Sequence, residues 1–291
     1  MTRGVSGAAS EAVPGWREVA DRVFVRRYAF FDQEIGAILG DGEVLLVDTR
    51  STTAMARELL ADLRRLTTAP WRVVNTHHHF DHSFGNAVFR PAETWGLARC
   101  AERLRADGEA TRAEMAREMP EIAAELAETV VDPPDRTFTG RADLVIGGRA
   151  VELVHLGRGH TDNDVVVRVT DAGVLFAGDL VEQGAPPYFG DSFPLDWPAT
   201  LGHLLDLGPG PIVPGHGDIV DRDFVAAQLA EIALVAERAR REWHDLVAAG
   251  RDPAGPPPRP LTDDVARLLG WPLPVVAEAL SRAFLQLAGR F

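Results

Sequence analysis

The greatest concentration of ligand-type side chains lies in residues 76–82, which read Thr-His-His-His-Phe-Asp-His. Four of the nine histidines of the chain fall in this segment, and an aspartate stands among them. His77 and His79 are two residues apart, so an extended backbone would direct both imidazoles to the same side. Asp81 and His82 follow at a turn and can point to a second position. Imidazole and carboxylate donors without a thiolate suit divalent zinc, iron or manganese, and there are enough of them for two ions.

Further ligand-type residues stand shortly after predicted strands in three other parts of the sequence. Strand ends can meet at one edge of a sheet, so we expect these segments to join the first one in a single metal site. The residues are His160, Asp179 and His216, which follow apolar runs that end at Val154, Phe176 and Val213.

The elements that must position these residues are predicted from hydrophobic spacing and turn residues. Two strands, 34–40 and 43–48, flank an Asp41-Gly42 turn, and a helix over 51–66 leads to a strand over 71–75. Residues 86–128 are predicted to be mainly helical, with interruptions near Gly108 and Pro120. Further strands are predicted at 144–146, 151–155, 165–169, 174–177 and 212–213, and helices at 199–207, 221–248 and twice after Leu261.

The domain organisation predicted from these patterns is one catalytic domain with short appendages. Residues 1–15 are expected to be a flexible leader, 16–250 the catalytic domain with a helical insert at about 91–130, 251–260 a proline-rich linker, and 261–291 a helical extension. The second helix of that extension carries an apolar stripe at Val276, Leu280, Phe284 and Leu287. This stripe predicts packing either on the body of the protein or across a homodimer.

Composition and charge narrow the classes of function. The formal charge is −13 over 291 residues, and all 30 basic residues are arginine. An acidic surface disfavours nucleic-acid binding, and the absence of lysine excludes Schiff-base chemistry and a P-loop. The single Cys100 cannot form an intrachain disulfide. No apolar run reaches the ~20 residues that a membrane-spanning helix needs, and the leader lacks the apolar centre of a signal peptide, so we expect a cytoplasmic protein with a small-molecule substrate.

Four motifs together resemble the metallo-β-lactamase superfamily. They are the segment 76–82, Gly159-His160-Thr161, Ala177-Gly178-Asp179 and Pro214-Gly215-His216-Gly217, in the order of the family and within about residues 18–250. The resemblance implies an α/β fold, a four-layer αβ/βα sandwich with the metal site at one edge between its two sheets, here followed by the helical extension.

The resemblance also implies a ligand set and a reaction. His77, His79 and His160 would hold one ion, Asp81, His82 and His216 a second, and Asp179 would bridge them. Two divalent ions roughly 3.5–4 Å apart lower the pKa of a shared water toward neutrality. The hydroxide formed would attack an electrophilic carbonyl, with Asp81 orienting it, and zinc is the first choice of metal, ahead of iron and manganese.

Three residues are predicted to support the site. Asp48 ends the strand over 43–48, where the family often has an acidic residue that bonds toward the metal loop; a simple turn is the alternative. Tyr188, in the turn-rich segment 182–191, is a candidate for a hydrogen bond to substrate, or else a hydrophobic plug. Arg158, close to His160, is a candidate for anion binding, or else a solvated or ion-paired side chain.

Asp179 stands where thiolate-containing β-lactamases of this fold have cysteine, and it is similar to the residue that hydroxyacylglutathione hydrolases, lactonases and phosphodiesterases use. The sequence therefore favours hydrolysis of an ester, thioester or lactone. A redox iron enzyme of the same fold, such as a persulfide dioxygenase, a promiscuous β-lactamase or phosphodiesterase, and a metal-binding scaffold without turnover are the alternatives.

Overall fold

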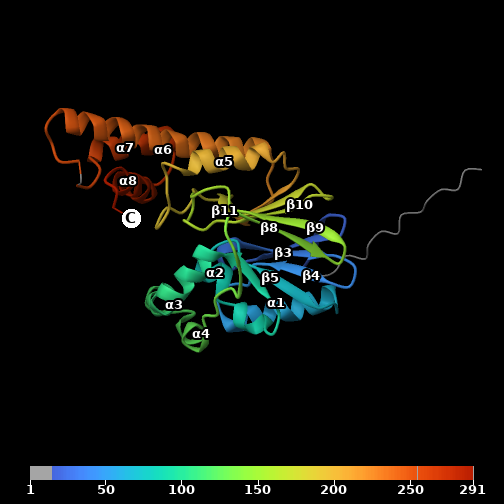
Figure 1. Cartoon of the computed structure of the whole chain (residues 1–291). Helices are drawn as coiled ribbons and strands as arrows, with labels where there is room; N and C mark the ends of the chain where they lie inside the picture. The colour runs from blue at the N-terminus through green and yellow to red at the C-terminus, as the bar shows by residue number, and fades with distance from the viewer. Residues whose placement is uncertain (1–14, 254, 291) are drawn as a thin grey trace, which may run out of the picture.

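A computed structural model of the protein describes residues 15–253 and 255–290. The predicted leader therefore lies outside the described residues, apart from Gly15. Two halves of mixed α/β structure meet along the middle of the molecule, with helices on both outer sides (Figure 1).

The first half is a mixed sheet in which three neighbouring pairs of strands run parallel and three antiparallel. From one edge its order is β7-β6-β5-β4-β3, with β2 and β1 continuing beside β3. Strands β4 to β7 are parallel, whereas β1, β2, β3 and β4 pair antiparallel. The strands are β1 (Arg17–Ala20), β2 (Val23–Tyr28), β3 (Gln33–Leu39), β4 (Val44–Val47), β5 (Trp71–Val74), β6 (Thr94–Leu97) and β7 (Arg136–Phe138).

The second half is mainly antiparallel. Its order is β12-β11-β10-β9-β8, and only the β11–β12 pair is parallel among its described strands. The two halves join through one residue pair, His216 of β12 with Gln33 of β3. The strands are β8 (Arg141–Ile146), β9 (Arg149–Val154), β10 (Val166–Val169), β11 (Val174–Glu182) and β12 (Ile212–His216).

Helix α1 covers the outer face of the first half and α5, α6, α7 and α8 cover that of the second, whereas α2, α3 and α4 pack into the apolar cluster between the sheets. Figure 1 shows α1 with α2, α3 and α4 on the side of the first half, and α5 and α6 on the side of the second, with α7 and α8 beside α6. Their bounds are α1 (Thr53–Leu66), α2 (Phe80–Ser83), α3 (Ala98–Glu118), α4 (Ala123–Glu128), α5 (Trp197–Asp206), α6 (Arg222–Ala248), α7 (Arg259–Leu269) and α8 (Leu273–Leu287); the short 3-10 turns η1 (Phe30–Asp32) and η2 (Asn86–Phe89) complete the set.

Three apolar clusters account for the layers. One contains inward-facing residues of both halves, such as Leu45 and Phe176, and so lies between the sheets. A second joins the outer face of the first half to α1, for example through Leu46 and Leu59. The third joins the second half to α5, α6, α7 and α8, with Trp197 among its fully buried members. Alternating strand residues thus face different clusters, as the two-residue repeat of a strand requires, and the predicted four-layer sandwich is confirmed.

Several local predictions need correction. Four strands were not predicted from the sequence, β1, β2, β6 and β7, which are short and lack a long alternating pattern. Residues 94–97 of the predicted helical insert form β6. Helix α3 is not interrupted at Gly108, because this glycine gives room to a neighbouring segment: a Cβ there would lie 2.7 Å from Val131 Cγ1. The predicted linker ends early, since Arg259 and Pro260 form the first turn of α7, where proline is well tolerated.

The C-terminal helices pack on the body of the chain. Val276, Leu280 and Phe284 are buried in the third cluster, and the Phe284 ring lies 5.6 Å from that of Trp243 on α6. Of the two arrangements predicted for the apolar stripe, the structure therefore has the packing on the body of the protein. In the described part of the chain no single helix is long and apolar enough to cross a membrane, and α7 with α8 meets the criterion only as a pair bent by 118°.

The outer-face packing can be tested with two leucines. Leu59→Ala removes a fully buried side chain of α1 and is expected to lower the free energy of unfolding by about 2–5 kcal/mol, through lost transfer energy and a cavity. The matched control is Leu268→Ala on α7, where the side chain is 51% exposed, and its effect should stay within about 0.5 kcal/mol. Urea denaturation of both variants measures the difference, and equal losses would contradict the assigned core.

Candidate metal centre

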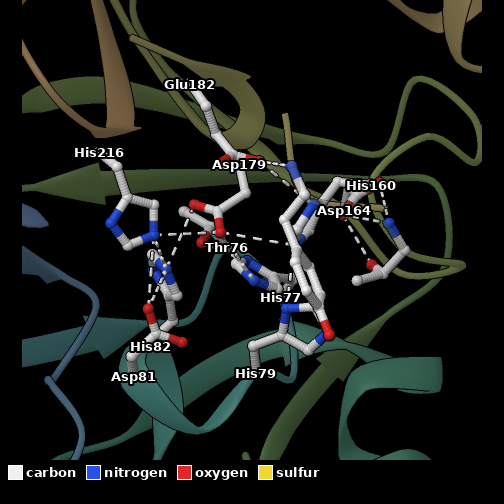
Figure 2. Close-up of polar contacts among 12 residues, drawn as sticks. Thr76, His77, His79, Asp81, His82, His160, Asp164, Asp179, Glu182 and His216 are labelled. Carbon is white, nitrogen blue, oxygen red and sulfur yellow. Dashed lines mark hydrogen bonds and ion pairs between the residues drawn. The ribbon is translucent and has the colours of Figure 1, made fainter. Parts of the chain in front are cut away.

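Five histidines and two aspartates from separate parts of the chain meet in one cluster (Figure 2). His77 and His79 lie in the turn that follows β5, and Asp81 and His82 lie on the short helix α2. His160 comes from the connection between β9 and β10, and His216 is the last residue of β12. Asp179 lies inside β11 and not after it, because this strand continues to Glu182 beyond its predicted end at Ala177.

The first group of donors is formed by His77, His79, His160 and Asp179. One ligand atom from each of these residues lies within 4.8 Å of all the others. His79 Nδ1 is 2.9 Å from His160 Nε2, and Asp179 Oδ2 is 3.6 Å from His77 Nε2 and 3.4 Å from His160 Nε2. Four donors within this radius match the number that a tetrahedral ion uses.

The second group is formed by Asp81, His82 and His216, whose ligand atoms also lie within 4.8 Å of one another. His82 Nε2 is 3.3 Å from His216 Nε2, and Asp81 Oδ2 is 3.3 Å and 3.4 Å from these two nitrogens. Asp179 is in reach of this group too, since its Oδ1 is 3.2 Å from His82 Nε2 and its Oδ2 is 3.2 Å from His216 Nε2. Figure 2 shows its carboxylate between the two groups.

Hydrogen bonds on the outer side of the imidazoles fix which nitrogen faces the cluster. Asp48 accepts from the backbone N–H of Thr76, from Thr76 Oγ1 and from His82 Nδ1, all at 2.8 Å. Because Thr76 Oγ1 gives its one proton to Asp48, it accepts from His77 Nδ1 at 3.1 Å. The inner Nε2 atoms of His77 and His82 are thereby left to face the other donors. Asp48 has φ 65°, a costly backbone conformation that places its carboxylate here.

The remaining imidazoles are oriented from other elements. His216 Nδ1 donates to the carbonyl oxygen of Phe31 at 2.7 Å, so its Nε2 faces the cluster. Phe31 itself adopts φ 58° in the turn η1. His79 is turned the other way, with Nδ1 toward His160 and Nε2 3.0 Å from Asp191 Oδ1. Orientation by outer hydrogen bonds of this kind is typical of histidines that ligate metals.

The electrostatics of the cluster favour a cation. Within the described residues, His77 Nε2 is buried and has no hydrogen-bond partner. Burial alone would lower the pKa of His82, yet the carboxylates of Asp179 and Asp81 raise it well above its usual value. Against the same effect of burial, Asp179 raises the pKa of His216 to about 11. The cluster therefore attracts positive charge, and a divalent ion fits the converging lone pairs and carboxylates; its binding would displace protons.

The supporting residues predicted from sequence have different positions. Asp48 lies directly behind His82, as described above. Tyr188 lies at the mouth of the site: its side chain is 54% exposed, and its ring centre is 6.2 Å from that of His79 and 6.1 Å from that of His160. Arg158 does not join the cluster, because its guanidinium pairs with Asp196 at 2.6 Å and lies over the ring of Phe193.

Three polar residues beside the cluster were not identified from the sequence. Glu182 Oε1 is 3.6 Å from His160 Nδ1, and burial, followed by the charge of Asp179, raises the pKa of Glu182 to about 8. Asn163 Nδ2 is 2.9 Å from His78 Nδ1, which joins the two metal loops. Asp191 contacts His79. None of the three belongs to a recognisable sequence motif, although Glu182 and Asp191 are the ends of the turn-rich segment that carries Tyr188.

Comparison with known proteins identifies the family. The model of the metallo-β-lactamase superfamily matches residues 31–216, which is more than half of the chain. The protein therefore belongs to the metallo-β-lactamase superfamily. This match includes all seven residues of the two donor groups.

Curated relatives match over shorter segments. The metallo-β-lactamase type 2 of Bacteroides fragilis is 29% identical over 90 residues, covering 29% of this chain and 36% of that protein. The hydroxyacylglutathione hydrolase of Rhodospirillum rubrum is 30% identical over 155 residues, half of each chain. A linear primary-alkylsulfatase of a Pseudomonas species is 26% identical over 220 residues, 61% of this chain and 40% of its own. The chain thus spans half or less of the length of these relatives. The hydrolases among them support a metallo-hydrolase.

Solved structures agree with the fold. A metallo-β-lactamase from Pontibacter korlensis superposes with a TM-score of 0.61 at 22% identity, over 75% of this chain and 98% of its own. The DIM-1 metallo-β-lactamase gives a TM-score of 0.60 at 19% identity, over 77% and 99% of the two chains. At such identities the likeness establishes the architecture.

The close packing around Asp179 leads to a prediction for Gly215. A Cβ at this position would lie 1.7 Å from Asp179 Oδ1, so Gly215→Ala must displace the carboxylate. We expect the affinity for zinc to fall by about 10-fold or more, as for other changes that misplace a ligand. The control is Gly202→Ala on α5, where a Cβ meets no atom of another segment within 4 Å. Competition with a chromophoric chelator measures both, and an unchanged affinity in Gly215→Ala would argue against Asp179 as a ligand.

Proposed function

We propose that the protein is a metal-dependent hydrolase that uses two divalent ions, zinc before iron or manganese, to cleave an ester, thioester or lactone of a small molecule. The observation that carries this proposal is the position of the Asp179 carboxylate, within 3.2–3.6 Å of imidazole nitrogens from both donor groups. A shared carboxylate is the arrangement expected when two cations lie side by side.

Some residues of the site would hold the ions, and others would orient the reactants. His77, His79 and His160 would hold the first ion, and Asp81, His82 and His216 the second, with Asp179 between them. When bound, two such ions lower the pKa of a shared water toward neutrality and polarise a carbonyl oxygen.

The chain itself supplies groups that can orient the water and the substrate. The Asp81 carboxylate lies in the second donor group, where it can accept a hydrogen bond from the attacking water and align it with the substrate. Tyr188, above His79 and His160, can donate its hydroxyl proton in a hydrogen bond to a substrate oxygen. Burial first, and then nearby acidic groups, raise the pKa of Tyr188 to about 12, which keeps this hydroxyl protonated at neutral pH.

The carbonyl substrate is favoured by two observations. The bridging position holds aspartate and not cysteine, and a hydroxyacylglutathione hydrolase is among the relatives, 30% identical over 155 residues. Slow turnover of β-lactams or phosphodiesters is compatible with the same centre. A mononuclear iron oxygenase, such as a persulfide dioxygenase, needs one ion for its chemistry, whereas this chain assembles two groups of donors.

Asp179→Ala tests the dinuclear centre. Removing a residue that only hydrogen-bonds to a metal ligand lowers metal affinity or activity by about 10–100-fold. Loss of a shared ligand should therefore lower the rate of ester or lactone hydrolysis by about 100-fold or more, and it should reduce bound zinc below the wild-type amount. His203→Ala is the control, because His203 is exposed on α5 and bonds only to the carbonyl oxygen of Leu156 among the contacts described.

The measurements are elemental analysis of the purified protein and turnover of a panel of lactones, thioesters, phosphodiesters and β-lactams. Two equivalents of zinc with carbonyl-ester turnover support the proposal. One redox-active iron with oxygen uptake, or full activity in Asp179→Ala, would refute it.

A further inference from the structure

The imidazole of His79 is held between two different partners. Its Nδ1 is 2.9 Å from His160 Nε2 inside the first donor group, and its Nε2 is 3.0 Å from Asp191 Oδ1 on the opposite side. The ring can therefore present an unprotonated Nδ1 to an ion only if its proton stays on Nε2. The other contact of the Asp191 carboxylate with the metal loop is weaker, at 3.6 Å from His78 Nε2.

Asp191 is suited to hold that proton because its Oδ1 lies at hydrogen-bond distance from His79 Nε2. Arg103 on α3 adds positive charge, with Nη2 3.9 Å from Asp191 Oδ2. An ionised carboxylate accepts hydrogen bonds and cannot donate, so it selects the tautomer of His79 with Nε2–H.

The segment that carries Asp191 is fastened to two parts of the molecule. On one side, the backbone N–H of Phe193 donates to the carbonyl oxygen of Gly159, next to His160. On the other side, α8 holds the segment through two side chains: Gln286 Oε1 accepts from the N–H of Leu195 at 2.9 Å, and Arg282 Nε donates to the carbonyl oxygen of Ser192 at 3.2 Å. The C-terminal helix α8 is thus connected to His79, a proposed metal ligand, through the segment 192–195 and Asp191.

We propose that Asp191 is a positioning residue that fixes the tautomer and ring orientation of His79, and that α8 keeps Asp191 in place through its hydrogen bonds to the segment 192–195. The inference rests on the proposed function, because it assigns the role of Asp191 to the first ion. It gives the C-terminal helices a part in metal binding although they contribute no ligand.

The first experiment compares substitutions at Asp191 in the full-length protein. Asp191→Ala should weaken binding of the first zinc ion by about 10–100-fold, the usual effect of losing an outer carboxylate on a ligating histidine. Asp191→Asn keeps a hydrogen-bond acceptor without the charge, so its affinity for the first zinc ion should lie between that of the wild type and that of Asp191→Ala. The matched control is Asp196→Asn in the same segment, where the carboxylate pairs with Arg158 and contacts no donor of the cluster among the described residues.

Nitrogen NMR of the zinc-loaded protein gives a readout that does not depend on activity. In the wild type, the His79 ring should show a protonated Nε2 whose hydrogen exchanges slowly with water. In Asp191→Ala, this signal should broaden or disappear because the proton is exposed, while the signals of His77 and His82 should persist. A merely structural role for Asp191 would change all the histidines or none.

The link to α8 is tested with a double-mutant cycle. Gln286→Ala removes one hydrogen bond to the segment 192–195. In the wild-type background it should lower the affinity for the first zinc ion by about 2- to 10-fold. In the Asp191→Ala background the same substitution should have no further effect, because α8 would act only through Asp191.

The outcomes separate this inference from the proposed function. If the wild type binds two zinc ions but Asp191→Ala binds them equally well with an unchanged His79 signal, the role of Asp191 is wrong and the hydrolase proposal stands. Additive effects of Gln286→Ala and Asp191→Ala would overturn the link to α8. A wild-type protein that binds no zinc, iron or manganese would overturn both proposals.

Discussion

A carboxylate buried among imidazoles is the constraint on which the rest of the structure depends. The Asp179 side chain is 5% exposed and lies inside β11, whose other residues are almost all apolar. Removing an unpaired carboxylate from water costs several kcal/mol, and only opposite charge with good geometry offsets that cost. The histidines supply it, because His82 and His216 lower the pKa of Asp179 against the effect of burial. Two glycines leave room for the close packing of β11 against β12 and the metal loop. A Cβ at Gly215 would overlap the Asp179 carboxylate, and a Cβ at Gly178 would lie 2.8 Å from Thr76 Cβ.

The surrounding elements hold the imidazoles from outside. The carbonyl oxygen of His82 accepts from the N–H of Thr49 and from Asn75 Nδ2, which ties α2 to the ends of β4 and β5. Asp48 and Phe31, both with positive φ, place an acceptor behind His82 and His216. Such conformations are costly and persist where the surroundings impose them, often at functional sites. The donors are consequently fixed in position by the folded chain itself, a condition for fast and selective metal chemistry.

The sequence contains enough information to predict the seven donors but less about what supports them. The donors stand in short motifs whose spacing along an extended chain or a turn already limits where they point. Asp48 could be predicted because it ends an apolar strand next to the metal loop. Asp191 could not be, since its contact with His79 depends on a turn 112 residues away whose course no periodicity describes. Arg158 shows the converse: its closeness to His160 in sequence suggested a role in the site, whereas its side chain turns to Asp196.

The four-layer arrangement was predicted from the resemblance to the family, and many of its elements from hydrophobic spacing. The buried face of α1 and the stripe of α8 are visible as periodic patterns in the sequence, whereas β1, β2, β6 and β7 are specified mainly by the strands they pair with. Gly108 illustrates the limit of local rules. Glycine usually weakens a helix, but here it lets α3 pack closely against Val131, and tertiary contact overrides the propensity.

The site and its outer support differ in how they relate to the family. The segment that matches the superfamily ends at His216, so Phe31 and both donor groups lie within it, whereas α6, α7 and α8 follow it. Yet α8 holds the turn that carries Asp191 and that places Tyr188 above His79 and His160. A fold shared by relatives named for different substrates cannot by itself determine selectivity, which must come from what surrounds the reacting atoms. In this chain α8 contributes to those surroundings on the side of the first donor group, because its side chains hold the segment that carries Asp191 and follows Tyr188.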